Sequence, residues 1–165
     1  PEFIARKHGR KEIVYDIQNK TFLTGKSRRD GANHEQVANM QANDDEENAN
    51  QVLRSISMAF SNLKTKLGEY LDLARTTATN ELIASDEELH LGLKMPSNYN
   101  SSTVDTLAAA AHQYVVSMAV ADWFTITHKT DAPEYSSLAE VSLQIISEAV
   151  NKRSRPKRTV STAGQ

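Results

Sequence analysis

The sequence contains no cysteine and few residues that interrupt helices, with six Gly and four Pro among 165 residues. Without cysteine there can be no disulfide framework and no cysteine-based metal or redox site. This fits a reducing cytoplasm, although a lack of cysteine is compatible with any compartment. No apolar run reaches the roughly 18 residues that a membrane-spanning helix needs, so no membrane association is expected.

Signals for processing and for catalysis are also missing. The N-terminus has no apolar segment after its basic residues, which argues against a secretory signal. Pro1, Glu2 and Phe3 are compatible with a native start after removal of Met and with residues added at cloning. The sequence has no phosphate-binding glycine loop, no nucleophile elbow and no HExxH pattern. We therefore expect no enzyme, no cofactor and no metal site.

Two polar residues on otherwise apolar helices are candidate site residues. His112 lies in an Ala-rich segment, where a hydrogen-bonded structural histidine is favoured over a ligand. Asp122, next to Trp123, is the one acid on an otherwise apolar stretch of helix. If it were buried with a raised pKa, it would be a site candidate. An interhelical or intersubunit hydrogen bond is the favoured role for Asp122.

What the sequence does contain is helical periodicity. Apolar residues in residues 44–73 recur at steps of three and four, which predicts one amphipathic helix of about 30 residues. They are Leu53, Ile56, Phe60, Leu63, Leu67 and Tyr70. Asn43 is the expected N-cap, and the acidic run at residues 44–47 suits the positive end of the helix dipole. Earlier in the chain, residues 34–41 are expected to form a short helix with Val37 and Met40 inward.

Two further long helices are predicted. The first opens near Ser102 and Asp105 and ends at about Thr127; being apolar on several sides, it is expected to be central. The second starts near Pro133 and ends at Asn151. The predicted inner face of the last helix consists of Tyr135, Leu138, Val141, Ile145, Ile146, Ala149 and Val150.

Between the first two long helices the period changes to two. Leu89, Leu91, Leu93 and Met95 alternate with other residues, which predicts a strand. We expect it to pair with residues 80–84 in a β-hairpin at about 79–95 that turns near residues 85–88. Near the N-terminus, residues 12–15 suggest a short strand or a partner-pairing segment. Residues 16–25 suggest a short helix, with a strand as the alternative at 21–24.

The net charge of -2 conceals a segregation of charge along the chain. Residues 1–29 carry eight Lys and Arg against three acids, residues 30–151 carry six against eighteen, and residues 152–165 carry five bases and no acid. The predicted organisation is a basic N-terminal arm (1–36), a helical domain (37–151) and a basic C-terminal arm (152–165). Arms of this sign suit nucleic acid or the acidic body of a neighbouring copy. The candidate interface residues are Arg6, Lys7, Arg10, Lys11, Leu89, Leu91, Leu93, Arg153, Arg155, Lys157 and Arg158.

The fold class predicted from these features is mainly α. It is a bundle of three main helices with an inserted β-hairpin and extended basic N- and C-terminal arms.

The order of these features resembles the head–tail connector (portal adaptor) family of tailed bacteriophages. The matching segments cover about residues 37–156: the acidic run 43–48 (NDDEEN), the helix end 68–71 (GEYL), the segment 93–97 (LKMPS) before an Ala-rich helix, and a last helix that ends in a basic segment. Residues 118–124 (MAVADWF) and 151–156 (NKRSRP) are similar to proteins of phages and prophages from gut Bacteroidetes.

The resemblance implies a virion structural protein of the neck region, assembled in the host cytoplasm. About twelve copies would form a homo-oligomeric ring below the portal protein, contact tail or neck proteins, and surround genomic DNA without recognising its sequence. The basic arms would bind adjacent copies or the portal, and the unpaired hairpin edges would be completed by strands from neighbours. The alternative function is that of a helical nucleic-acid-binding protein that grips DNA with its basic arms.

Overall fold

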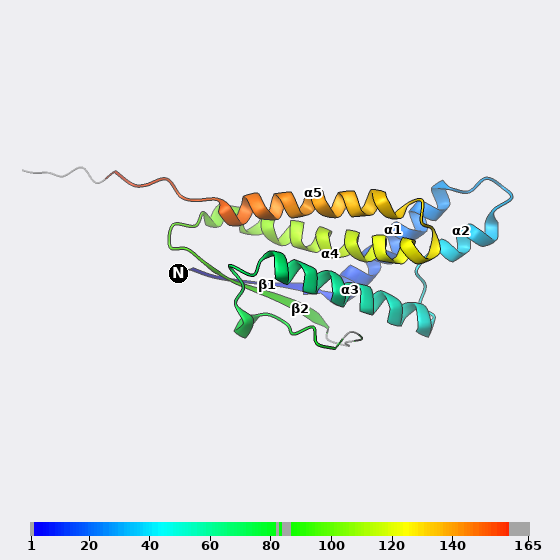
Figure 1. Cartoon of the computed structure of the whole chain (residues 1–165), viewed down its shortest axis with the longest axis horizontal. Helices are drawn as coiled ribbons and strands as arrows, with labels where there is room; N and C mark the ends of the chain where they lie inside the picture. Colours follow the sequence, from blue (N-terminus) through cyan, green and yellow to red (C-terminus); the bar gives the residue numbers. More distant parts are fainter. Residues whose placement is uncertain (1, 82, 84–86, 159–165) are drawn as a thin grey trace, which may run out of the picture.

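The computed structural model describes residues 2–81, 83 and 87–158, which form one layered helical unit with a two-stranded sheet (Figure 1). In chain order the elements are β1 (Glu2–Gly9), α1 (Arg10–Ser27), α2 (His34–Met40), α3 (Glu46–Lys66), the 3-10 turn η1 (Leu73–Arg75), β2 (Glu88–Met95), the 3-10 turn η2 (Ser101–Thr103), α4 (Val104–Thr127) and α5 (Ala132–Asn151). The mainly α class, with three main helices and an antiparallel strand pair, is confirmed. No helix in the described ranges has the length and apolar character needed to cross a membrane.

Helix α4 is the centre of the fold, as its composition predicts. Thirteen of its 24 residues are buried, and α5, α3 and α1 all pack against it. Small residues such as Ala110, Ala111 and Ala119 let neighbouring helices approach closely, and Phe124 and Val116 fill the interior. Trp123 is buried with its indole N–H donating to the Met40 carbonyl at 2.7 Å, which ties α2 to the core.

Helix α3 presents the predicted stripe but is shorter than expected. Ile56, Phe60 and Leu63 are buried, while Leu53 at the edge is only partly covered. The helix ends at Lys66 rather than near residue 73. Leu67 is the C-cap and Gly68 comes next, and glycine disfavours helix continuation. The next residues hydrogen-bond elsewhere: the Tyr70 carbonyl accepts from the Lys94 amide at 2.7 Å.

The predicted strand at residues 89–95 is present as β2, but its partner comes from the N-terminus. β1 and β2 are antiparallel over eight residue pairs, from Glu2 opposite Met95 to Gly9 opposite Glu88. Residues 82 and 84–86 of the expected hairpin lie outside the described residues, and residues 80, 81 and 83 are not in a strand. The sheet is therefore made from distant parts of the chain, because β2 pairs with β1 rather than with the segment that precedes it.

The other edge of β2 is covered by the segment at residues 70–77. The Asp72 amide donates to the Gly92 carbonyl and the Thr77 amide to the His90 carbonyl, both at 2.9 Å. Gly92 permits this approach, because a Cβ built there would lie 2.5 Å from the Arg75 Cβ and 2.9 Å from its carbonyl oxygen. A side chain at position 92 would push this segment off the sheet.

The N-terminal residues belong to the helical unit, so the predicted boundary at residue 36 is not a structural one. Residues 12–15, interpreted from sequence as a short strand or a pairing segment, are part of the 18-residue helix α1. Ile4 of β1 and Ile13 and Ile17 of α1 are in the same hydrophobic cluster as α3 and α4. The short helix α2, with Val37 and Met40 buried, matches its prediction.

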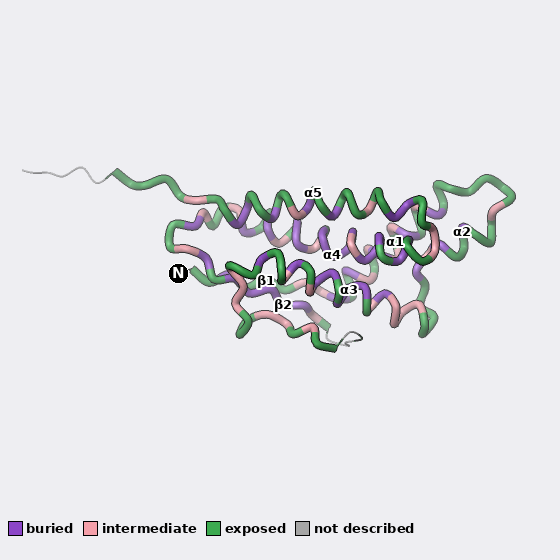
Figure 2. Tube along the Cα trace, viewed as in Figure 1, coloured by how far each residue is buried: buried purple, intermediate pink, exposed green. Residues whose placement is uncertain are grey.

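Helix α5 has the predicted bounds, with Pro133 in its first turn, but its predicted inner face is only partly correct. Ile146, Ala149 and Val150 are buried against α4, whereas Leu138, Val141 and Ile145 are exposed. Figure 2 shows the outer side of α5 as exposed along much of its length. The apolar arc of α5 is wider than the surface that α4 covers.

Candidate interaction site

The start of β1 and the end of α5 lie at one end of the molecule (Figure 1). In Figure 1 the N-terminal strand starts, and the C-terminal segment leaves α5, at the same end of the long axis. Arg6 and Lys7 of β1 are both exposed. The Arg6 guanidinium lies 3.9 Å from the Asp105 carboxylate, an exposed pair of little energetic weight.

Lys7 is engaged within the chain. Its Nζ donates to Glu88 Oε1 at 2.9 Å across the strand pair. This hydrogen bond and the attraction between the two charges raise the pKa of Lys7, and the same hydrogen bond lowers the pKa of Glu88. Both groups are therefore charged at neutral pH, and much of the Lys7 charge is balanced by Glu88.

The first residues after α5 are fixed to the domain. The Lys152 carbonyl accepts from the Asn100 amide at 3.0 Å, and the Ser154 amide donates to the Asn98 carbonyl at 2.8 Å. The Arg153 guanidinium donates to the Val150 carbonyl at 2.8 Å. The C-terminal arm is consequently anchored up to Ser154.

Beyond this anchor the charges point into solvent. Arg155, Lys157 and Arg158 are exposed, and no carboxylate in the described part of the chain lies within ion-pair distance of them. Of the predicted basic residues, these three and Lys11 are exposed and form no ion pair within the described part of the chain.

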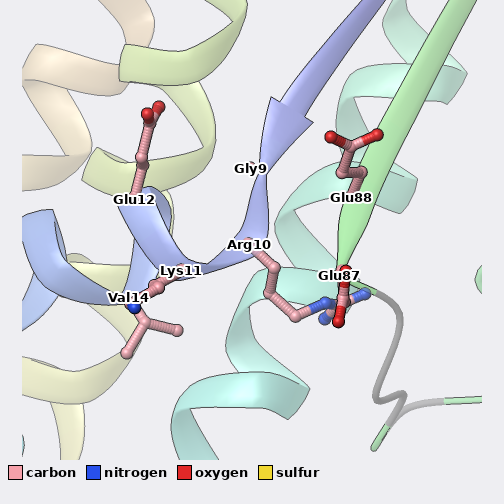
Figure 3. Close-up of a pocket in the computed structure, with 7 residues that line it drawn as sticks. All are labelled: Gly9, Arg10, Lys11, Glu12, Val14, Glu87 and Glu88. Atoms are coloured by element: carbon pink, nitrogen blue, oxygen red, sulfur yellow. The ribbon is translucent and has the colours of Figure 1, made fainter.

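Arg10 and Lys11 stand where β1 passes into α1, beside a surface depression of about 650 Å³ (Figure 3). Arg10 is buried, and its side chain extends toward Glu87 in Figure 3. Its backbone amide donates to the Glu87 carbonyl at 2.9 Å. Glu12 and Glu88 also line the depression, so its charges are mixed and give no selectivity for an anion or a cation. Arg10 is therefore structural, whereas Lys11 is exposed.

The three leucines predicted as interface residues are core residues. Leu89, Leu91 and Leu93 are 0%, 3% and 1% exposed. Their side chains are part of the hydrophobic core that β2 shares with the helices. One edge of β2 is paired with β1 of the same chain. The three leucines are not available to a neighbouring copy, and the prediction that they form an interface is wrong.

Two histidines and an acid form a cluster between β1, α1 and α4. His112 Nε2 lies 2.6 Å from Asp16 Oδ2, as expected for a hydrogen-bonded structural histidine. The His8 ring lies 6.1 Å from the His112 ring, centroid to centroid. Burial, and secondarily the charge of His112, lower the pKa of His8 to about 4. His8 is thus neutral at neutral pH.

Sequence reasoning did not find the ion pair at the α4–α5 turn. Asp131 is 1% exposed, and its carboxylate accepts from Arg28 at 2.5 Å and lies 2.8 Å from His128 Nδ1. The hydrogen bond from Arg28 to Asp131 also raises the pKa of that guanidinium. This contact joins the end of α1 to the start of α5. Asp131 looks like an ordinary turn residue, so only the tertiary arrangement reveals it.

Asp122 has the favoured structural role. Its Oδ2 accepts from the Ser55 hydroxyl at 2.5 Å, an interhelical hydrogen bond between α4 and α3. The residue is exposed, so the interpretation as a buried carboxylate is wrong.

Within residues 2–81, 83 and 87–158, no three His, Asp or Glu side chains gather closely enough to hold a metal ion. No protein-family model matches the sequence, and searches of curated proteins and of solved structures returned no match.

Proposed function

We propose that this protein is a structural virion subunit, a component of a neck ring that joins the portal of a tailed phage to its tail and surrounds the DNA channel. The proposal starts from the sequence resemblance described above. In the virion, copies of this chain, the portal and tail or neck proteins would be its partners.

One structural observation carries the proposal: free basic residues and a run of exposed acids lie toward opposite ends of the molecule (Figure 1). The free basic residues Arg155, Lys157 and Arg158 leave the end at which α5 finishes. The acidic run at residues 44–47 is exposed at the start of α3, at the other end of the long axis (Figure 1). Molecules with this polarity attract one another and acidic partners in a defined orientation. An acidic wall would also repel DNA phosphates and let DNA pass.

The experiment is negative-stain microscopy and mass measurement of the purified protein at physiological and at high salt. The proposal expects rings whose stability depends on the C-terminal charges. The informative truncation ends after Ser154, since it removes the free charges and keeps the anchoring contacts of Arg153. The triple variant Arg155→Gln, Lys157→Gln, Arg158→Gln is the matched full-length control. Assembly that neither change affects would refute the role of the arm.

The same three exposed cations favour a second candidate, a nucleic-acid-binding protein. A gel shift with duplex DNA at several salt concentrations separates the two functions. Each phosphate contact contributes about -0.9 to the slope of log affinity against log salt. If the arm binds DNA, the triple glutamine variant should flatten that slope by about 2–3. The neck-ring proposal expects weak binding and no such change.

A further inference from the structure

Helix α5 carries an exposed apolar stripe that α4 does not cover. Leu138, Val141 and Ile145 are 47%, 52% and 40% exposed, and their spacing of three and four residues places them on one face. Glu134 and Glu148 continue the same face at its two ends, and both are exposed. We call this set the α5 face. Three large apolar side chains in one row, framed by acids, are typical of a helix-packing surface rather than of scattered surface residues.

Helix α1 carries a second exposed row with the opposite charge. Tyr15 and Phe22 are 65% and 42% exposed and stand seven residues apart, on one side of the helix. Lys11 and Lys26 are exposed on that side at the two ends of the row. We call this set the α1 face. The opposite side of α1, with Ile17 at its centre, is buried in the domain.

The two faces match in length, spacing and charge. The lysines of the α1 face are 15 residues apart and the glutamates of the α5 face 14, or about 22 Å and 21 Å along the helices at 1.5 Å per residue. Tyr15 and Phe22 stand four and eleven residues after Lys11. Leu138 and Ile145 stand four and eleven residues after Glu134. Laid side by side, the two faces bring apolar residues together and a lysine to a glutamate at each end.

We propose that the α1 face of one copy packs on the α5 face of a second copy. This inference rests on the self-assembly in the proposed function and names the contact that produces it. The interface joins two different surfaces of the same chain, which is a heterologous contact, and such contacts generate rings when the rotation between copies closes. The apolar rows provide the affinity, and the lysine–glutamate pairs at the exposed ends provide orientation more than strength.

The neighbouring charges are compatible with this docking. Two acids adjoin the α1 face: Asp16 is engaged by His112, and the exposed Glu12 stands next to Lys11. Glu134 lies close enough to Arg28 of its own chain to raise the pKa of that guanidinium, yet it forms no ion pair with it. It therefore remains available to a lysine of a second copy.

The test measures self-association of the full chain by sedimentation equilibrium, with circular dichroism to verify folding. Val141→Asp places a charge in the middle of the α5 face and should weaken association at least tenfold. Leu73→Asp is the matched control, because Leu73 is 77% exposed on η1, outside both faces. It should leave association unchanged. Equal association of wild type and Val141→Asp would overturn the inference while leaving the proposed function standing.

Charge reversal tests the pairing itself. The double variant Lys11→Glu, Lys26→Glu should weaken self-association. The double variant Glu134→Lys, Glu148→Lys should weaken it as well. Mixing the two double variants should restore association, because the reversed face of one then meets the reversed face of the other across a heterologous interface. Failure of the mixture to associate better than either variant alone would overturn the pairing of these two faces. A wild-type protein that is monomeric at every concentration and salt would overturn both this inference and the proposed function.

Discussion

Replacing Ile4 with alanine tests whether the N-terminal strand is part of the folded core. Ile4 is 5% exposed and stands opposite Leu93 in the strand pair. The substitution removes about three methyl or methylene groups, worth about 2.4 kcal/mol in transfer free energy, and it leaves a cavity. We expect the free energy of unfolding to fall by about 2–4 kcal/mol.

Its neighbour provides the control. Phe3 is 49% exposed on the outer face of the sheet, where the Arg75 guanidinium lies 4.2 Å from its ring centroid. Phe3→Ala should cost less than about 1 kcal/mol, the strength of an exposed cation–π contact. Urea denaturation followed by the fluorescence of Trp123 measures both variants. If Ile4→Ala unfolds within about 0.5 kcal/mol of wild type, residues 2–9 form a free arm and the strand pairing is wrong.

Three further outcomes follow from buried polar groups. His8 has a pKa of about 4 in the folded chain and about 6.5 when unfolded. As the pH falls, the unfolded chain therefore binds this proton first. The free energy of unfolding should decrease as the pH drops from 6.5 toward 4, by up to about 1.4 kcal/mol per pH unit. In urea titrations at several pH values, His8→Gln should make this decrease smaller. Trp123→Phe leaves the Met40 carbonyl without its donor and should lower the free energy of unfolding by about 1–3 kcal/mol, whereas an unchanged denaturation midpoint would rule out that hydrogen bond. Asp131→Ala removes the partner of Arg28. Because the Arg28 guanidinium is half exposed, the free energy of unfolding should fall by about 1–3 kcal/mol in thermal or urea unfolding. A buried charge left without its partner would cost more.

The helices α2 to α5 were predictable from the sequence because their signals are local, whereas α1 (Arg10–Ser27) was predicted only in part. The stripe around Ile56 and Phe60, the central Ala-rich helix and the start of α5 at Pro133 follow from residue spacing and caps. The strand pairing was not predictable in this way. The alternation at Leu89–Leu93 identifies a strand but not its partner, and the paired residues are 79 (Gly9 and Glu88) to 93 (Glu2 and Met95) positions apart along the chain.

Burial on α5 was mispredicted for a related reason. A wide apolar arc indicates that a helix has apolar neighbours, but it does not say whether all of them belong to the same chain. Leu138, Val141 and Ile145 have the spacing of core residues and are exposed. Asp131 had no sequence signal, since its burial depends on Arg28 from a distant helix.

The proposed neck-ring function requires that this chain assembles into a closed ring of identical copies. Mass measurement of the purified full chain near physiological salt, by light scattering after size exclusion with negative-stain images of the same fraction, tests it most directly. We expect one species of many times the 18.3 kDa chain mass, about twelve copies if the connector resemblance holds, seen as rings. A single species of one chain mass at every protein concentration, with no rings in the images, would contradict it.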